Sequence, residues 1–159
     1  MVTVTKAALK AELVALLAAA LETARRAHAA ALEGATHAEA KPENNKDTRG
    51  LEQSYLARGQ AQRVAELEAG LADVSALALR TFGPQDPIAM SAFVTAEEDD
   101  QRLRLFIAPH GGGSVLASSV QVVTPASPLG HALLGKRVDD DVEVRLPGRT
   151  RTLVIIAIE

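Results

Sequence analysis

Acidic side chains gather in one short segment that has no regular apolar pattern. Glu39, Glu43 and Asp47 recur at four-residue spacing within residues 34–47. Carboxylate oxygens are the ligands that a hard divalent cation prefers, so this segment has the chemistry of a metal site. Spacing alone nevertheless favours ordinary solvated residues. Thr36 and Glu39 have capping-box spacing, and Glu43 suits the positive end of a helix dipole.

The other residues with catalytic potential form no recognisable constellation. The chain has no Cys, which excludes disulfides, thiolate metal sites and Cys nucleophiles. His37 lies near the acidic residues, but a single loop histidine is more often solvated than bound to metal. Residues 111–113 are three glycines without the Lys-Ser/Thr of a phosphate loop, and a hairpin tip is expected there. Ser127 precedes Pro128 and fits a turn better than a nucleophile.

Two long helices are predicted to flank the acidic segment. Residues 5–33 lack Pro and are rich in Ala and Leu, which are strong helix formers, and Gly34 fits a helix C-cap. A second helix is predicted from about residue 43 to residue 79. Two long helices with a short connector pack antiparallel, so residues 1–82 are predicted to form a coiled-coil hairpin with its tip near residues 36–47. The predicted apolar seam of the first helix is Leu9, Leu13, Leu16, Ala20, Ala24, Ala27 and Ala31.

The second half of the chain has the short alternating patterns of β structure. Gly83, Pro84 and Pro87 end the helical region. Strands are predicted at residues 88–95, 102–108, 115–123, 142–146 and 153–158, with turns at 97–100, 109–113 and 147–148 and a short helix at 130–134. The predicted fold is therefore α+β, with a helical hairpin beside an antiparallel β domain that covers residues 83–159.

Composition excludes several classes of function. A net charge of −3 argues against a broad basic face for duplex DNA, and an aromatic content of 3% without Trp argues against base-stacking platforms. The N-terminus shows no secretory signal pattern. The apolar run at residues 13–21 spans only about half of the ~20 residues needed to cross a bilayer. A cytoplasmic protein without a membrane partner is expected.

The sequence resembles the Gre family of bacterial transcription elongation factors, which stimulate transcript cleavage. Residues 127–144 (SPLGHALLGKRVDDDVEV), followed by Leu-Pro-Gly at 146–148, are similar to the C-terminal signature of this family. Residues 42–44 (Pro-Glu-Asn), with Glu-Gln at 52–53 and Gly59 downstream, are similar to its hairpin tip and the start of its second helix. The resemblance extends along the whole chain in order and length, and it indicates a divergent branch.

The resemblance implies an accessory factor rather than an enzyme, with an FKBP-like C-terminal domain. Family members insert the hairpin into the secondary channel of bacterial RNA polymerase and dock the C-terminal domain on the rim. Acidic tip residues help to hold Mg²⁺ in the polymerase active site, where backtracked RNA is cut. No cofactor of its own is implied. The nascent RNA 3′ end is a further expected contact, and the factor is expected to be a monomer.

The resemblance also assigns roles to individual residues. Glu39 and Glu43 are the expected catalytic residues, and both are expected to contact metal only in the complex with polymerase. The expected partner-binding residues are Asn44, Arg49, Ser127, Pro128, Leu129, Gly130, Lys136 and Arg137.

The tip departs from the family pattern at one position. The family motif has an Asp, two further residues, and then Glu-Asn. Aligned on Glu43 and Asn44, the Asp position falls on Ala40, with Glu39 one residue earlier and Asp47 later. Two outcomes remain open. Either Glu39 replaces the missing Asp and cleavage is retained, or the tip occupies the channel as a non-cleaving regulator.

Two functions from other classes are disfavoured. A prolyl isomerase built on an FKBP-like domain requires an aromatic-lined pocket, and only Phe93 and Phe106 are aromatic after the linker. A coiled-coil adaptor would dimerise through the Ala/Leu seam, which an intramolecular hairpin would instead use within one chain.

Overall fold

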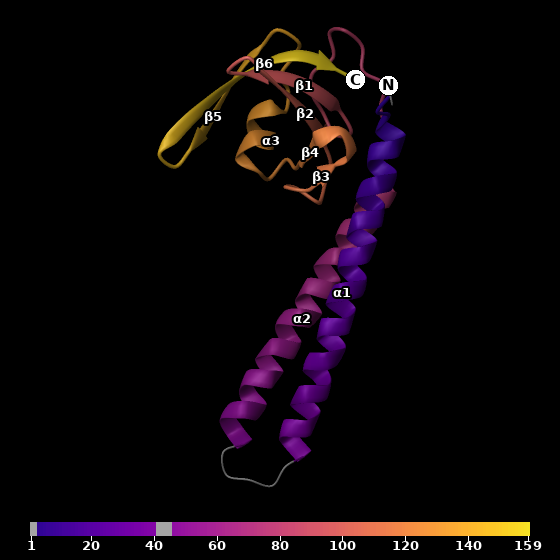
Figure 1. Cartoon of the computed structure of the whole chain (residues 1–159), viewed down its shortest axis with the longest axis vertical. Helices are drawn as coiled ribbons and strands as arrows, with labels where there is room; N and C mark the ends of the chain where they lie inside the picture. Colours follow the sequence, from indigo (N-terminus) through magenta and orange to yellow (C-terminus); the bar gives the residue numbers. More distant parts are fainter. Residues whose placement is uncertain (1–2, 41–45) are drawn as a thin grey trace. The chain divides into compact units, whose positions relative to one another are not determined.

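The computed structural model describes the backbone of residues 3–40 and 46–159, and the side chains of residues 3–36 and 50–159. The chain forms two compact units (Figure 1). The hairpin unit is Ala15–Ala72, and the β unit combines Met1–Val14 with Asp73–Glu159. The predicted α+β fold class, a helical hairpin beside a β domain, is confirmed. The predicted domain boundary between residues 82 and 83 stays a prediction.

The hairpin unit contains most of α1 (Lys6–Ala40) and α2 (Lys46–Ser75), which lie side by side in Figure 1. Arg25 pairs with Glu68 at 3.0 Å, and farther along α1 Gly34 lies beside Gln53. The later residue of α1, Gly34, thus lies beside the earlier residue of α2, Gln53. The two helices are therefore antiparallel. The buried hydrophobic residues among the described side chains of this unit are Leu17, Leu21, Ala24, Ala31, Ala57 and Leu67.

Two predictions about the first helix are wrong. Leu16 was expected in the seam but is 43% exposed, because the neighbouring Leu17 takes the inward position. Gly34 was expected to end the helix, yet α1 continues to Ala40. A Cβ at Gly34 would lie 2.8 Å from Gln53 Oε1, so this glycine allows a close approach to α2 rather than a turn.

The capping role expected for Thr36 is also wrong, because Thr36 lies inside α1. Its hydroxyl donates to the Leu32 carbonyl oxygen at 2.9 Å, one helical turn earlier. The predicted tip near residues 36–47 stays a prediction. Residues 36–40 and 46–47 are helical, and residues 41–45 lie outside the described part of the chain.

The second helix ends at Ser75 rather than near residue 79. The chain beyond it is held by other contacts. The Lys10 ammonium donates to the Leu77 carbonyl oxygen at 2.8 Å, and the Arg80 N–H donates to the hydroxyl of buried Ser91 at 2.9 Å. These bonds within the β unit compete with continued helix.

The β unit contains a six-stranded sheet with the order β3-β4-β2-β1-β6-β5. All neighbouring pairs are antiparallel except β2 and β4, which are parallel. The sheet is therefore mixed rather than wholly antiparallel as predicted. Its strands are β1 (Phe93–Glu98), β2 (Gln101–Ile107), β3 (Val115–Leu116), β4 (Val120–Val123), β5 (Asp141–Leu146) and β6 (Arg149–Ile158).

Left-handed backbone conformations set the strand boundaries that sequence patterns misplaced. Ser91, with φ 74°, interrupts the predicted strand at 88–95, so β1 begins at Phe93. Asp99 and Asp100 both have positive φ and form a two-residue hairpin turn, so the turn predicted at 97–100 is shorter. Ser118 and Ser119 each have φ 59°. They divide the strand predicted at 115–123 into β3, a 3-10 turn (Ala117–Ser119) and β4.

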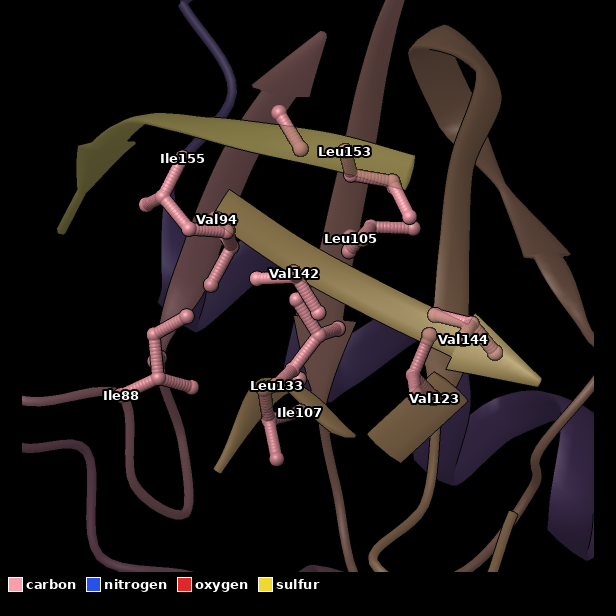
Figure 2. Close-up of a cluster of buried hydrophobic side chains, with 12 residues drawn as sticks. Ile88, Val94, Leu105, Ile107, Val123, Leu133, Val142, Val144, Leu153 and Ile155 are labelled. Carbon is pink, nitrogen blue, oxygen red and sulfur yellow. The ribbon is translucent and has the colours of Figure 1, made fainter. Parts of the chain in front are cut away.

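The main core lies between the sheet and α3 (Pro128–Leu133). Figure 2 shows Leu133 of α3 among side chains from the strands, including Val142 of β5 and Leu105 of β2. Each of these three side chains is at most 1% exposed. Leu133 thus anchors α3 against the sheet. The residues that flank α3 are held in position by the same core.

Candidate functional site

The start of α3 is built by three residues of the C-terminal signature. The Ser127 hydroxyl donates to the Thr124 carbonyl oxygen at 2.8 Å and accepts from the Gly130 N–H at 3.0 Å. Ser127 is thus the helix N-cap, and Pro128 follows it in the first turn, where a missing N–H costs nothing. The serine predicted to form a turn does so, as the cap of α3.

Gly130 and Gly135 have separate structural reasons to be glycine. Gly130 is buried, and a Cβ there would overlap the backbone oxygen of Thr124. Gly135 has φ 83°, a conformation that side chains disfavour, and follows the end of α3. Its N–H donates to the Ile88 carbonyl oxygen at 2.9 Å, while the Ile88 N–H donates to the Lys136 carbonyl oxygen at 2.7 Å.

The remaining predicted partner-binding residues of this segment differ in exposure. Leu129 packs against the main core, and Lys136 is half-buried. Arg137 is exposed, and its Nε donates to the Gln85 carbonyl oxygen at 3.0 Å. Its backbone N–H donates to Asp140 Oδ2 at 2.8 Å. Arg137 is therefore held in place while its guanidinium stays accessible.

Exposed side chains around α3 define what is here called the α3 surface: Pro128, His131 and Arg137. Pro128 and His131 lie about one turn apart on the helix. Sequence reasoning did not select His131, although its position three residues after Pro128 was the available signal. Partner binding by this surface stays a prediction.

The structure does not describe the side chains of the predicted tip residues. Glu39 lies near the end of α1 and Arg49 near the start of α2, both in residues of which only the backbone is described. Glu43 and Asn44 fall within residues 41–45, outside the described part of the chain. The predicted association of Glu39 with Glu43 stays a prediction.

A strong ion pair that sequence reasoning missed joins β1 to β6. Arg151 donates from Nε and a terminal nitrogen to the two oxygens of Glu98, at 2.8 and 3.1 Å. This hydrogen bond lowers the pKa of Glu98 and raises the pKa of Arg151. The two side chains are 22% and 24% exposed and lie 53 residues apart in sequence. No local pattern links them, and their role is structural.

No group of three or more His, Asp and Glu side chains among the described residues is arranged to hold a metal ion. No helix among them combines the length and the apolar character needed to cross a membrane.

Residues 83–159 match a protein-family model described as the C-terminal domain of transcription elongation factors GreA and GreB. A curated relative, transcription elongation factor GreA of Sphingopyxis alaskensis, is 35% identical over 75 residues. This match covers 46% of the chain and 46% of the relative, so the chain spans about half the length of the curated relative that it matches.

Solved structures with some likeness include two GreA factor homologues named Gfh1. The Thermus thermophilus protein is 22% identical, with 92% of this chain and 94% of that chain covered and a TM-score of 0.41. The Thermus aquaticus protein is 25% identical, with 90% and 91% covered and a TM-score of 0.42. It is through residues 83–159, which contain the capped α3 with Gly130 and Gly135, that the chain is similar to the transcription elongation factors GreA and GreB.

Proposed function

We propose that this protein is a Gre-like transcription elongation factor that binds bacterial RNA polymerase as an accessory factor. The observation that carries the proposal is the family match over residues 83–159. The signature residues in that match also have defined physical roles, since Ser127 caps α3 and Gly130 and Gly135 permit its close contacts. The antiparallel hairpin is the second part that a Gre-like factor requires.

The hairpin is proposed to act inside the secondary channel of the polymerase. The 35 residues of α1 make a helix of about 50 Å at 1.5 Å per residue, a length suited to reaching along a narrow channel. Residues Asn44 and Arg49 are proposed to contact the channel or the nascent RNA 3′ end.

Cleavage of backtracked RNA is proposed to depend on Glu39 and Glu43. Carboxylate oxygens are suitable ligands for Mg²⁺, and a second metal close to the first helps to activate water and stabilise the leaving oxygen. The metal belongs to the polymerase active site, so the factor supplies ligands only. Because Ala40 occupies the position of the family Asp, Glu39 is the acid proposed to compensate.

The α3 surface is proposed to dock on the rim of the channel. Arg137 is exposed but fixed through Gln85, which limits the conformational entropy that it would lose on pairing with an acidic group. Pro128 adds a rigid apolar contact beside it. Lys136 is proposed as a second cationic contact.

The test is RNA cleavage by a stalled, backtracked polymerase with the wild type, Glu39→Ala or Glu43→Ala. Glu66→Ala is the matched control, since Glu66 is an exposed acid of α2 that accepts a hydrogen bond from Gln62 of the same helix. Wild type and control should accelerate cleavage, and the two tip variants should lose at least roughly tenfold in rate while still binding.

Binding is measured in parallel with Arg137→Glu. Arg145→Glu, at an exposed arginine of β5 that pairs with Glu143, is the control. Arg137→Glu should weaken polymerase binding about tenfold or more, and the control should not. Wild-type binding without faster cleavage would replace the cleavage proposal with a non-cleaving regulator. Absence of binding by the wild type would reject the Gre-like function as a whole.

A further inference from the structure

The sheet of the β unit buries apolar side chains on both faces, although α3 covers only one. Side chains alternate along a strand, so Phe106 points away from the core residues Leu105 and Ile107. Phe106 is nevertheless 0% exposed. Register places the same buried face on four strands, and its members are Phe93, Phe106, Leu116, Val120 and Val122.

This second buried face does not extend over the whole sheet. On β6, Thr152 points away from the core residue Leu153, and it pairs with Glu143 of β5. Both Thr152 and Glu143 are exposed. A covering layer therefore lies over β1, β2, β3 and β4, while the same face of β5 and β6 is open to solvent.

The first turns of α1 have the burial and the contacts expected of that covering layer. Leu9 is 1% exposed and Leu13 is 0% exposed, although neither belongs to the core around α3. A Cβ at Gly111 would lie 2.6 Å from Leu13 Cδ1, which places Leu13 directly against the loop after β2. Asp73, at the end of α2, adds a 2.7 Å contact to His110 in the same loop.

A polar contact from α1 holds the turn between β3 and β4. Both carboxylate oxygens of Glu12 accept from the Ala117 N–H at 3.0 Å. The next two residues, Ser118 and Ser119, both have φ 59°, which is unfavourable for residues with a side chain. Arg104 of β2 also donates to the Ser118 carbonyl oxygen at 3.1 Å. The strained turn is thus fixed between α1 and β2.

We infer that residues 5–14 act as a strap that completes the β domain. Thr5 caps the strap, since its hydroxyl accepts from the Ala8 N–H at 3.1 Å. Leu9 and Leu13 cover the second face of the sheet, and Glu12 positions the strained turn at residues 117–119. Residues 83–159, which match the family model, are consequently an incomplete folding unit without the strap. This inference does not depend on polymerase binding.

Hydrogen–deuterium exchange on the full chain tests the strap with a matched pair of variants. Leu13→Ala removes a buried side chain of the β unit, and Leu21→Ala removes a buried side chain of the hairpin unit from the same helix. In Leu13→Ala, amide protection in residues 104–123 should fall about tenfold or more. In Leu21→Ala, protection there should be unchanged, while that of the hairpin unit falls. Equal loss in both variants, or unchanged protection in Leu13→Ala, overturns the strap.

Glu12→Ala tests the turn separately and removes no buried apolar group. The Ala117 amide should exchange about tenfold faster, because its acceptor is lost. Glu22→Ala is the control, since Glu22 is an exposed acid of α1 with a 3.6 Å pair to Arg26. Unchanged exchange at Ala117 in Glu12→Ala would show that Glu12 does not position the turn.

Discussion

Two glycines and two leucines of the hairpin unit differ from Gly130 and Leu133 of the β unit in the space around them. In the hairpin unit, Gly50 and Gly59 have open space around the missing Cβ, and Leu51 and Leu56 are about half exposed. In the β unit, the space where Gly130 would carry a Cβ is filled by the backbone oxygen of Thr124, and Leu133 is completely buried. The hairpin is thus specified by helix propensity and a narrow seam, whereas the β unit is specified by fitted contacts that leave little freedom for substitution.

The largest expected effect is at Gly130. Gly130→Ala should lower the free energy of unfolding of the β unit by at least about 4 kcal/mol, because the new Cβ meets the backbone oxygen of Thr124. Urea unfolding measures the change. Gly50→Ala, at an open position of α2, is the control and should not destabilise. A Gly130→Ala protein with wild-type stability would contradict the fitted-contact description.

The next largest expected effect is a difference in stability loss when a leucine is truncated in each unit. Leu133→Ala should cost about 3 kcal/mol, because it removes a fully buried side chain and leaves a cavity beneath the sheet. Leu56→Ala, at a position 49% exposed in the hairpin, should change stability by less than about 0.5 kcal/mol. Urea midpoints for both variants test this difference, and comparable losses would remove the contrast.

The Glu98–Arg151 ion pair gives the β unit a predicted pH dependence. The pKa of Glu98 is lowered in the folded protein below its ordinary value of 4.5, chiefly by the hydrogen bond from Arg151. Its stabilising contribution is therefore fully present above that value and is lost as pH falls through the lowered folded pKa. Glu98→Gln should cost about 1 kcal/mol at pH 7 and less at an acidic pH well below 4.5.

Unfolding in urea at both pH values measures this effect. Glu143→Gln is the control, because its arginine partner Arg145 is largely exposed and its pair contributes little. A Glu98→Gln cost that stays the same at low pH would show that the carboxylate charge is not the source of the stabilisation.

The smallest expected effect is a gain in the hairpin. Gly59→Ala should stabilise the hairpin unit by roughly 0.5–1 kcal/mol, because the helix interior has open space there and alanine loses less backbone entropy. Thermal unfolding followed by the helical circular dichroism signal measures this gain in stability. The matched change in the β unit is Gly148→Ala, at a turn residue with φ 79°, which should instead destabilise. Destabilisation by Gly59→Ala would mean that α2 needs this glycine.

The C-terminal signature was informative because its residues have local roles. Ser127 and Pro128 are residue types that favour a helix start, and they begin α3. The Pro-Gly turn at 147–148 lies between β5 and β6 as predicted. The expected catalytic acids had no such support. Glu39 and Glu43 are recognised by likeness alone, because their spacing also fits solvated residues, and their side chains lie outside the described residues.

The amino-acid sequence by itself determined the helical hairpin, the β-rich second half and the likeness of residues 83–159 to GreA and GreB. Helix propensity, strand alternation and turn residues are local dihedral preferences, so they can be read along the chain. Only the tertiary structure decided the parallel pairing of β2 with β4, the Glu98–Arg151 bridge and the burial of Leu9 and Leu13 in the β unit. Each of these contacts joins segments far apart in sequence. The spacing of residues along one segment does not indicate which distant segment will pack against that segment.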